Sequence, residues 1–181
     1  EGALTANGTV AQLIQTYGSG WDGPGLGAAN LAYVFSMMTA QLDPAATQSE
    51  IRRAMAEWSK AIKISWVQAG NGGAAQTVNI LFGAGFHGDA YPFDGPNGVL
   101  AHTFYPAPAN PEPIAGDMHF DGSESWRIGS NLDIFSVALH ELGHSLGLGH
   151  SDDPSAVMYP YYRMVTQLSN MDKASAQTLY A

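Results

Sequence analysis

Three histidines and one glutamate in the last third of the chain have the spacing of a hydrolytic metal site. His140 and His144 are four residues apart, so on a helix both imidazoles project from one face, one turn apart. Two imidazoles at this spacing can bind one zinc ion and leave room for a third protein ligand and a water molecule. Glu141 follows the first histidine and can reach that water without binding the metal. Gly147 would allow the turn that returns His150 as third ligand, so the segment predicts a catalytic zinc centre.

The alternative interpretation is a buried helix that carries histidines only for packing, but every required offset is occupied by the required residue type. The segment His140–His150 resembles the zinc signature of the metzincin peptidases, HExxHxxGxxH, at each fixed position. The resemblance implies a methionine turn beneath the zinc, at Met158. With Ser151 directly after the last histidine, the segment resembles the matrixins (the matrix-metalloproteinase family), here of bacterial type. Serralysin-type enzymes usually have a tyrosine ligand two residues after the methionine, where this chain has Pro160. The stretch Trp21–Phe35 resembles the serralysin N-terminal region.

The composition indicates one globular domain, and the acidic net charge argues against negatively charged partners. The chain has 181 residues, of which 45% are hydrophobic, enough for a sizeable core. Seven basic against 16 acidic residues give a net charge of −9, which argues against nucleic acid or an anionic membrane and suits calcium binding. The absence of cysteine excludes disulfides and thiolate ligands. No secretory, lipidation or transmembrane signal is present, and the start at Glu1 is interpreted as a processed or trimmed form.

Hydrophobic periodicity predicts the elements that would position the zinc centre. Apolar runs predict strands at residues 30–36, 64–67, 78–82 and 99–105. Stripes at helical spacing predict helices at residues 10–17, 47–62, 131–147 and 171–180. Thr47 and Glu50 have the spacing of a capping box in the second helix, and Asn131 is the expected N-cap of the third. This order of elements favours a mixed α/β sheet with a crossover helix.

The resemblance implies the metzincin fold, an α/β (α+β) architecture. It comprises a mixed twisted five-stranded sheet with an antiparallel edge strand, a backing helix, an active-site helix and a C-terminal helix. We expect a single domain over residues 1–181, divided into an N-terminal helix and connector (1–28), an upper subdomain with the sheet and active-site helix (29–147) and a lower subdomain with the Met-turn and C-terminal helix (148–181). The edge strand would be Val99–Tyr105, above the cleft, where an extended peptide could pair with its unpaired backbone groups.

A second group of potential metal ligands lies upstream of the zinc signature. His87, Asp89, His102 and His119 offer three imidazoles and one carboxylate, a complete tetrahedral set without an open position. Single histidines in loops are usually solvated surface groups, but here the six histidines of the chain divide into two groups of three. The block resembles the structural-zinc segment of the matrixins at all four positions. It therefore predicts a structural zinc ion in addition to the catalytic one.

The same region supplies oxygen ligands for at least one calcium ion. Asp94, Asp121 and Glu124 are carboxylates of the type that hard cations prefer, and Gly95 permits a tight turn. Ordinary loop acids are the alternative interpretation. The resemblance implies one calcium site with the side chains of Asp94, Asp121 and Glu124 and the backbone carbonyls of Gly95, Asn97 and Val99 as ligands. A second calcium site of the family is left open, because Asp117 matches its pattern but other positions differ.

The resemblance implies a zinc-dependent endopeptidase that hydrolyses internal peptide bonds of extended polypeptides, by a zinc-activated water with Glu141 as general base. The expected substrate-binding residues are Leu100, Ala101, Ser136, Pro160 and Tyr162. The small side chain of Ser136 would leave an apolar pocket of medium depth. The alternatives are a catalytically inert, zinc- and calcium-stabilised protein-binding module, against which Glu141 argues, and a hydrolase of a non-peptide substrate. We expect a secreted, extracellular monomer whose partners are protein or peptide substrates, with no nucleic acid and no membrane.

Overall fold

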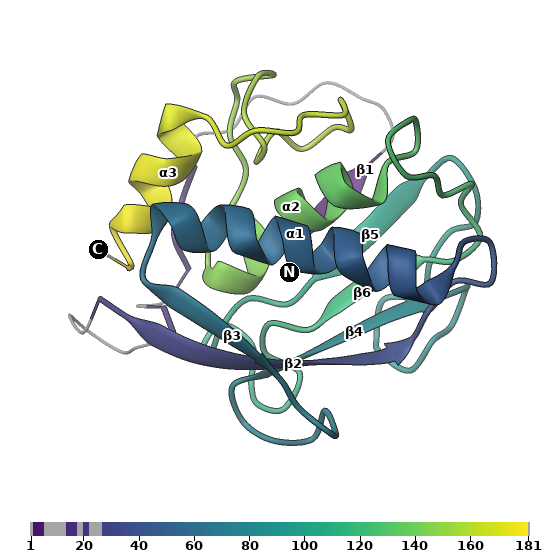
Figure 1. Ribbon diagram of the computed structural model, residues 1–181, viewed down its shortest axis with the longest axis horizontal. Helices are drawn as coiled ribbons and strands as arrows, with labels where there is room; N and C mark the ends of the chain where they lie inside the picture. Colours follow the sequence, from purple (N-terminus) through teal and green to yellow (C-terminus); the bar gives the residue numbers. More distant parts are fainter. Residues whose placement is uncertain (1, 6–13, 18–19, 22–26, 181) are drawn as a thin grey trace.

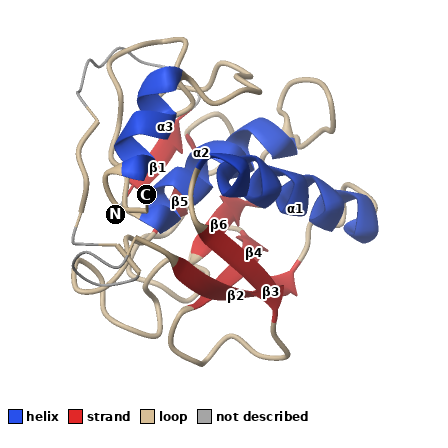
Figure 2. Cartoon of the chain, turned by 60° about the vertical axis from the view of Figure 1, so that its left-hand side comes forward, coloured by secondary structure: helices blue, strands red, loops and turns tan. Residues whose placement is uncertain are grey.

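The computed structural model describes residues 2–5, 14–17, 20–21 and 27–180. Its strands are β1 (Gly2–Thr5), β2 (Ala29–Met37), β3 (Ile64–Gln68), β4 (Thr77–Gly83), β5 (Val99–Thr103) and β6 (Met118–Asp121). Its helices are α1 (Pro44–Ala61), α2 (Ile134–Leu146) and α3 (Asn170–Gln177). Figures 1 and 2 show α1 and α2 on the same side of the sheet. The apolar faces of the two helices and of the sheet are buried against one another in one hydrophobic core. Within the described part of the chain, no helix is both long and apolar enough to cross a membrane.

The sheet confirms the predicted mixed arrangement and adds one strand. The strand order is β1-β5-β6-β4-β2-β3; β5 runs antiparallel to β6, and the other pairings among β2, β3, β4 and β6 are parallel. Strands β2–β6 therefore form the predicted five-stranded arrangement with an antiparallel strand β5, and β1 makes the observed sheet six-stranded. Strand β1, which pairs antiparallel with the outer side of β5, was not predicted. Strand β6 was not predicted either, because its His119 and Asp121 alternate with apolar residues in a segment whose composition is typical of a polar loop.

Helix α1 begins at Pro44, three residues before the Thr47 of the predicted capping box. Asp43 is the N-cap, and its carboxylate accepts a hydrogen bond from the Ala46 amide at 2.9 Å, with Pro44 in the first turn. The expected capping box of Thr47 and Glu50 is wrong, since a helix that starts at Pro44 already contains both residues. The predicted apolar stripe is buried, and its Trp58 indole donates a hydrogen bond to a backbone carbonyl of α2 at 2.9 Å.

Helix α2, which carries the zinc signature, starts later than predicted and is buried along its whole length. Asp133, rather than Asn131, is its N-cap and accepts a hydrogen bond from the Ser136 amide at 2.9 Å. Asn131 instead accepts a hydrogen bond from the Tyr162 hydroxyl at 2.9 Å. Gly147 ends the helix in the left-handed region with a φ of 112°, which confirms its predicted role in the turn.

Helix α3 is shorter than predicted and is capped by Ser169, which forms a capping box with Asp172. The predicted helix at residues 10–17 falls largely outside the described residues. Its described end contributes Thr16, which forms an isolated antiparallel bridge with Leu148, directly after α2. Near the end of the chain, the Tyr180 hydroxyl donates a hydrogen bond to the Leu146 carbonyl at 2.6 Å. Both contacts fix the C-terminal end of α2, where the chain turns toward His150.

Candidate metal centres and active site

The three histidines of the signature converge on one point. The Nε2 atom of His144 lies 3.0 Å from Nε2 of His140 and 3.1 Å from Nε2 of His150. On the other side of the two helical rings, Nδ1 of His140 lies 2.7 Å from the Val157 carbonyl and Nδ1 of His144 lies 2.7 Å from the Leu148 carbonyl. Each Nδ1–H thus donates to a carbonyl and leaves an Nε2 lone pair for a metal. Burial lowers the pKa of His140 to about 3 and also lowers that of His144, which keeps both imidazoles in the neutral, ligating form.

Met158 packs beneath the signature helix and is fully buried. A side chain at Gly143 would collide with the Met158 sulfur, so the glycine inside the signature allows this close approach. The turn that carries the methionine is held from α3, because the buried Asp172 carboxylate accepts hydrogen bonds from the amides of Val157 at 2.8 Å and Met158 at 3.2 Å. This contact between Asp172 and the methionine turn was not predicted from the sequence. Its only signal was an acidic residue at the start of the closing helix.

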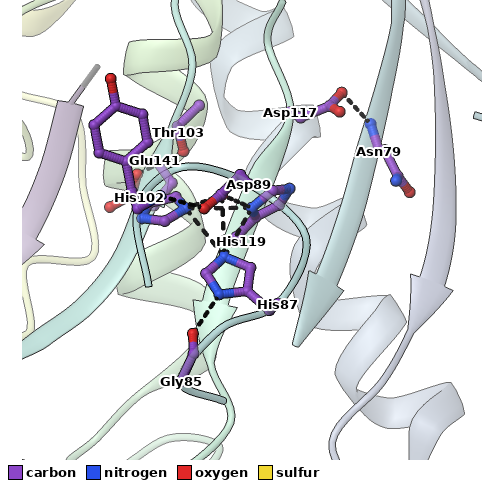
Figure 3. A network of polar contacts seen from close by, with 10 residues as sticks. Asn79, Gly85, His87, Asp89, His102, Thr103, Asp117, His119 and Glu141 are labelled. Atoms are coloured by element: carbon purple, nitrogen blue, oxygen red, sulfur yellow. Dashed lines mark hydrogen bonds and ion pairs between the residues drawn. The ribbon is translucent and has the colours of Figure 1, made fainter. Parts of the chain in front are cut away.

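Glu141 is fully buried and lies on the same helix as the first two histidines. Its Oε2 atom accepts a hydrogen bond of 2.6 Å from the hydroxyl of Thr103 on β5 (Figure 3). Thr103 is absent from the residues predicted for the site. Its signal was its position two residues after Ala101, since alternate residues of a strand face the same side.

The second predicted ligand set also converges (Figure 3). The Asp89 Oδ2 atom lies 3.1 Å from Nε2 of His87, 2.8 Å from Nε2 of His102 and 2.7 Å from Nδ1 of His119. The ring nitrogens lie 3.2–3.4 Å from one another. Tetrahedral zinc with bonds of about 2.0–2.1 Å places its ligand atoms about 3.3 Å apart, so this geometry fits a four-coordinate ion. Burial lowers the pKa of His119 to about 4, which favours the neutral imidazole.

Two of the three predicted calcium-binding carboxylates accept hydrogen bonds from backbone amides at the end of the loop before β5 and at the start of β5. The Asn97 amide donates to Oε1 of Glu124 at 2.7 Å, and the Val99 amide donates to Oδ1 of Asp94 at 3.1 Å. Burial, with the charges of Asp121 and Asp94, raises the pKa of Glu124. The arrangement therefore gathers negative charge that a cation would neutralise.

Asp121 supplies a further sign of a cation at this loop. Its Oδ1 atom accepts hydrogen bonds from the amide and hydroxyl of Ser123, whereas its buried Oδ2 atom has no hydrogen-bond partner among the described residues. Gly95 has a φ of 87°, as expected for the predicted turn. Among the described residues, only the two histidine clusters bring three or more metal-binding side chains together on one point. The three carboxylates are not such a group, so a calcium ion here would also need the backbone carbonyls.

A pocket opens beside His140, between α2 and the segment after Met158. Of the predicted substrate-binding residues, Ser136 and Tyr162 line it and Pro160 does not. Its remaining lining residues are Ala156, Val157, Tyr159, Tyr161, Arg163, Met164 and Val165. Most of the wall is thus formed by the predicted loop, with aromatic and aliphatic side chains and the charged side chain of Arg163.

The edge of β5, with Leu100 and Ala101, is not open as the sequence analysis expected. Strand β1 pairs with it, and the register places Gly2 opposite Thr103 and Leu4 opposite Ala101. Figure 1 shows β1 next to β5 and α2. The chain's own segment therefore occupies the position proposed for an extended peptide.

The fold and the site have the features of the metzincin class. These features are a mixed sheet backed by a helix, three convergent imidazoles, a glutamate on the helix that carries two of them, and a methionine beneath them. The matrixin family profile (Peptidase_M10) matches residues 25–181. The chain therefore belongs to the matrixin family.

Its relatives include bacterial and human proteins. Karilysin from Tannerella forsythia is 42% identical over 165 residues, which cover 90% of this chain and 34% of karilysin. Human matrix metalloproteinase-20 is 45% identical and human neutrophil collagenase 46% identical, each over 134 residues and 74% of this chain. The chain spans 26% of the former and 27% of the latter. It thus corresponds to about a third or less of the length of these relatives.

Proposed function

We propose that this domain cleaves internal peptide bonds of extended polypeptides, with zinc held by His140, His144 and His150 and with Glu141 as general base. The observation that carries the proposal is the convergence of three imidazole nitrogens within about one zinc coordination shell, next to a buried carboxylate on the same helix. When bound, zinc supplies Lewis-acid activation of water and of the scissile carbonyl. Glu141 takes the proton of the attacking water and transfers it to the leaving amine.

We further propose that His87, Asp89, His102 and His119 hold a structural zinc ion. Four ligand atoms in a closed, buried set leave no position for a substrate, and this supports a structural role over a catalytic one. The ion would tie the loop between β4 and β5 to strands β5 and β6, because two of the ligands lie in that loop and one in each strand.

A calcium ion at Asp94, Asp121 and Glu124, completed by the carbonyls of Gly95, Asn97 and Val99, is the third proposed metal. The raised pKa of Glu124 supports it, and so does the Oδ2 atom of Asp121, which has no hydrogen-bond partner in the described part of the chain, since a bound cation would stabilise both carboxylates.

The substrate would add to the edge of β5 in place of β1 and insert one side chain into the pocket beside His140. Most of the side chains that line the pocket, apart from Ser136, His140 and Arg163, are aromatic or aliphatic, which supports a preference for an apolar residue after the scissile bond. Secretion as a monomer is part of the proposal and follows from the calcium site and the family. The inert binding module is not favoured, because it would have no use for the buried Glu141.

Mass spectrometry of products from a mixed peptide library tests the proposal. Wild type, wild type with a zinc chelator, chelated protein with zinc restored, and Glu141→Ala are compared after zinc content and folding have been measured. We expect cleavage before apolar residues only in the wild-type and zinc-restored arms. Absence of cleavage by folded, zinc-loaded wild type would overturn the peptidase assignment and favour the binding module.

A further inference from the structure

We propose that Thr103 is the positioning residue for the general base: its hydroxyl holds the Glu141 carboxylate in the orientation needed for proton transfer. The inference rests on the proposed function, in which Glu141 takes a proton from the attacking water. It starts from the 2.6 Å hydrogen bond between Thr103 Oγ1 and Glu141 Oε2. Both side chains are 0% exposed, so water does not compete for this bond. An O–H donor to a carboxylate forms one of the shorter and stronger classes of hydrogen bond in proteins.

The two partners lie on different elements, Thr103 on β5 and Glu141 on α2, so the bond fixes the Glu141 side chain relative to the strand. Glu141 lies in the middle of α2, with His140 directly before it, and its long side chain has several torsions to fix. Thr103 is β-branched and therefore stiff at χ1. Its backbone pairs with Met118 of β6 on one side and, on the other, with Gly2 of β1, whose place the proposed substrate strand would take. A rigid donor thus fixes a flexible acceptor.

The bond also connects the general base to the strand along which the substrate is proposed to lie. Thr103 and Ala101 face the same side of β5, and the register of β1 shows that an added strand passes directly beside both. A substrate paired at this edge would be placed by the same strand that orients Glu141. Proton transfer demands such alignment, and a misplacement of about 1 Å can cost about a hundredfold in rate.

The alternative is a purely structural role, in which the Thr103 hydroxyl only finds a hydrogen-bond acceptor inside the fold. In that case its removal would not specifically change the rate constant of the chemical step. The positioning role requires the rate constant of the chemical step to depend on the hydroxyl, while substrate and zinc binding do not. Thr103→Val removes the hydroxyl at nearly constant shape, and Thr103→Ser keeps it. Thr77→Val is the matched control, because Thr77 is a buried threonine of β4 whose hydroxyl contacts the Ala75 carbonyl instead.

Steady-state kinetics on one peptide substrate are measured for wild type and the three variants, together with zinc content and zinc affinity by competition with a chelator. We expect Thr103→Val to lower kcat by about 10–100-fold with KM within about twofold of wild type. Thr103→Ser should recover most of kcat, and Thr77→Val should keep the wild-type kcat. Zinc content and affinity should be the same in all four proteins.

A thermal double-mutant cycle provides a readout that does not depend on activity. Thr103→Val is measured in the wild-type background and in Glu141→Ala, where the acceptor is absent. We expect Thr103→Val to lower Tm by about 2–4 °C more in the wild-type background, because only there does it remove a partner of a buried carboxylate.

The outcomes separate this inference from the proposed function. If wild type cleaves and Thr103→Val keeps its kcat, or if Thr103→Ser fails to restore a lost kcat, the positioning role is wrong and the peptidase assignment stands. Equal Tm shifts in the two backgrounds also overturn it. If zinc-loaded wild type does not cleave, the proposed function fails, and with it the role of Thr103 in catalysis. If Thr103→Val loses its fold, the same comparison is made with Thr103→Ala, judged again by recovery in Thr103→Ser.

Discussion

Replacement of Asp117 by Asn should make the protein more stable, and the gain should increase with pH. Asp117 precedes β6 and is 7% exposed, and its Oδ1 atom accepts a hydrogen bond of 2.9 Å from the Asn79 amide (Figure 3). Burial raises the pKa of Asp117 from 3.8 to about 8, and the nearby charge of Glu112 adds to the effect. Asparagine keeps an oxygen that can accept the Asn79 amide and carries no charge to bury.

The magnitude follows from the difference between the folded and unfolded pKa values. Because the folded pKa is raised, stability is complete below pH 4 and is lost as pH rises toward 8, while the unfolded chain ionises and the buried carboxyl does not. Each pH unit in this window costs about 1.4 kcal/mol. At pH 7, about three units above the unfolded pKa, the wild type would be destabilised on the order of 4 kcal/mol relative to a neutral side chain.

Urea unfolding of wild type and Asp117→Asn at pH 5 and pH 7, with calcium chelated, measures this effect. The stability difference in favour of Asp117→Asn should increase by about 2–3 kcal/mol between the two pH values. The exposed Asp152→Asn variant is the control and should show no such increase. A wild type that is as stable as Asp117→Asn at pH 7, or more stable, would refute the reasoning. If added calcium alone produced that result, Asp117 would be a ligand of the second calcium site that the sequence analysis left open.

Three further predictions concern the metal centres and the cleft. Deletion of residues 1–5 should lower KM several-fold without change in kcat, because β1 competes with substrate for the edge of β5; an unchanged KM would show that β1 does not limit access. Metal analysis should find two zinc ions per chain in wild type and one in both His102→Ala and His150→Ala, with peptidase activity lost in the second; a full zinc content in either variant would contradict its ligand assignment. Gly143→Ala should cost about 1–3 kcal/mol in urea unfolding, since its new methyl group meets the buried Met158 sulfur, whereas a wild-type value would mean that Met158 can move away.

The sequence contained most of the site because its ligands follow local rules. His140 and His144 are positioned by helical spacing, and Gly147 by the need for a left-handed residue at the helix end. Four of the six strands, β2 to β5, could be predicted from apolar patterns. Strand β6 could not, since half of its residues are polar.

The missed features depend on contacts between distant segments. Thr103 and Glu141 are 38 positions apart, and no spacing rule connects a strand residue to a helical carboxylate. The N-cap of α2 was placed at Asn131 because Asn and Asp are both favoured caps, and only the start of the helix at Ile134 selects Asp133. The pairing of β1 with β5 was likewise unreadable, because the edge of a strand accepts any extended segment that reaches it.

Strand β5 connects the closed histidine cluster to the general base proposed for the catalytic centre. His102 and Thr103 are neighbours on it, so their side chains point to opposite faces: the imidazole joins the closed ligand cluster, and the hydroxyl reaches Glu141. An ion in the closed cluster would fix His102 to His119 of β6 and to the loop before β5, and so would fix the backbone position of Thr103. The closed site would then contribute to catalysis through the orientation of the general base, although none of its ligands belongs to the histidine triad of the catalytic centre.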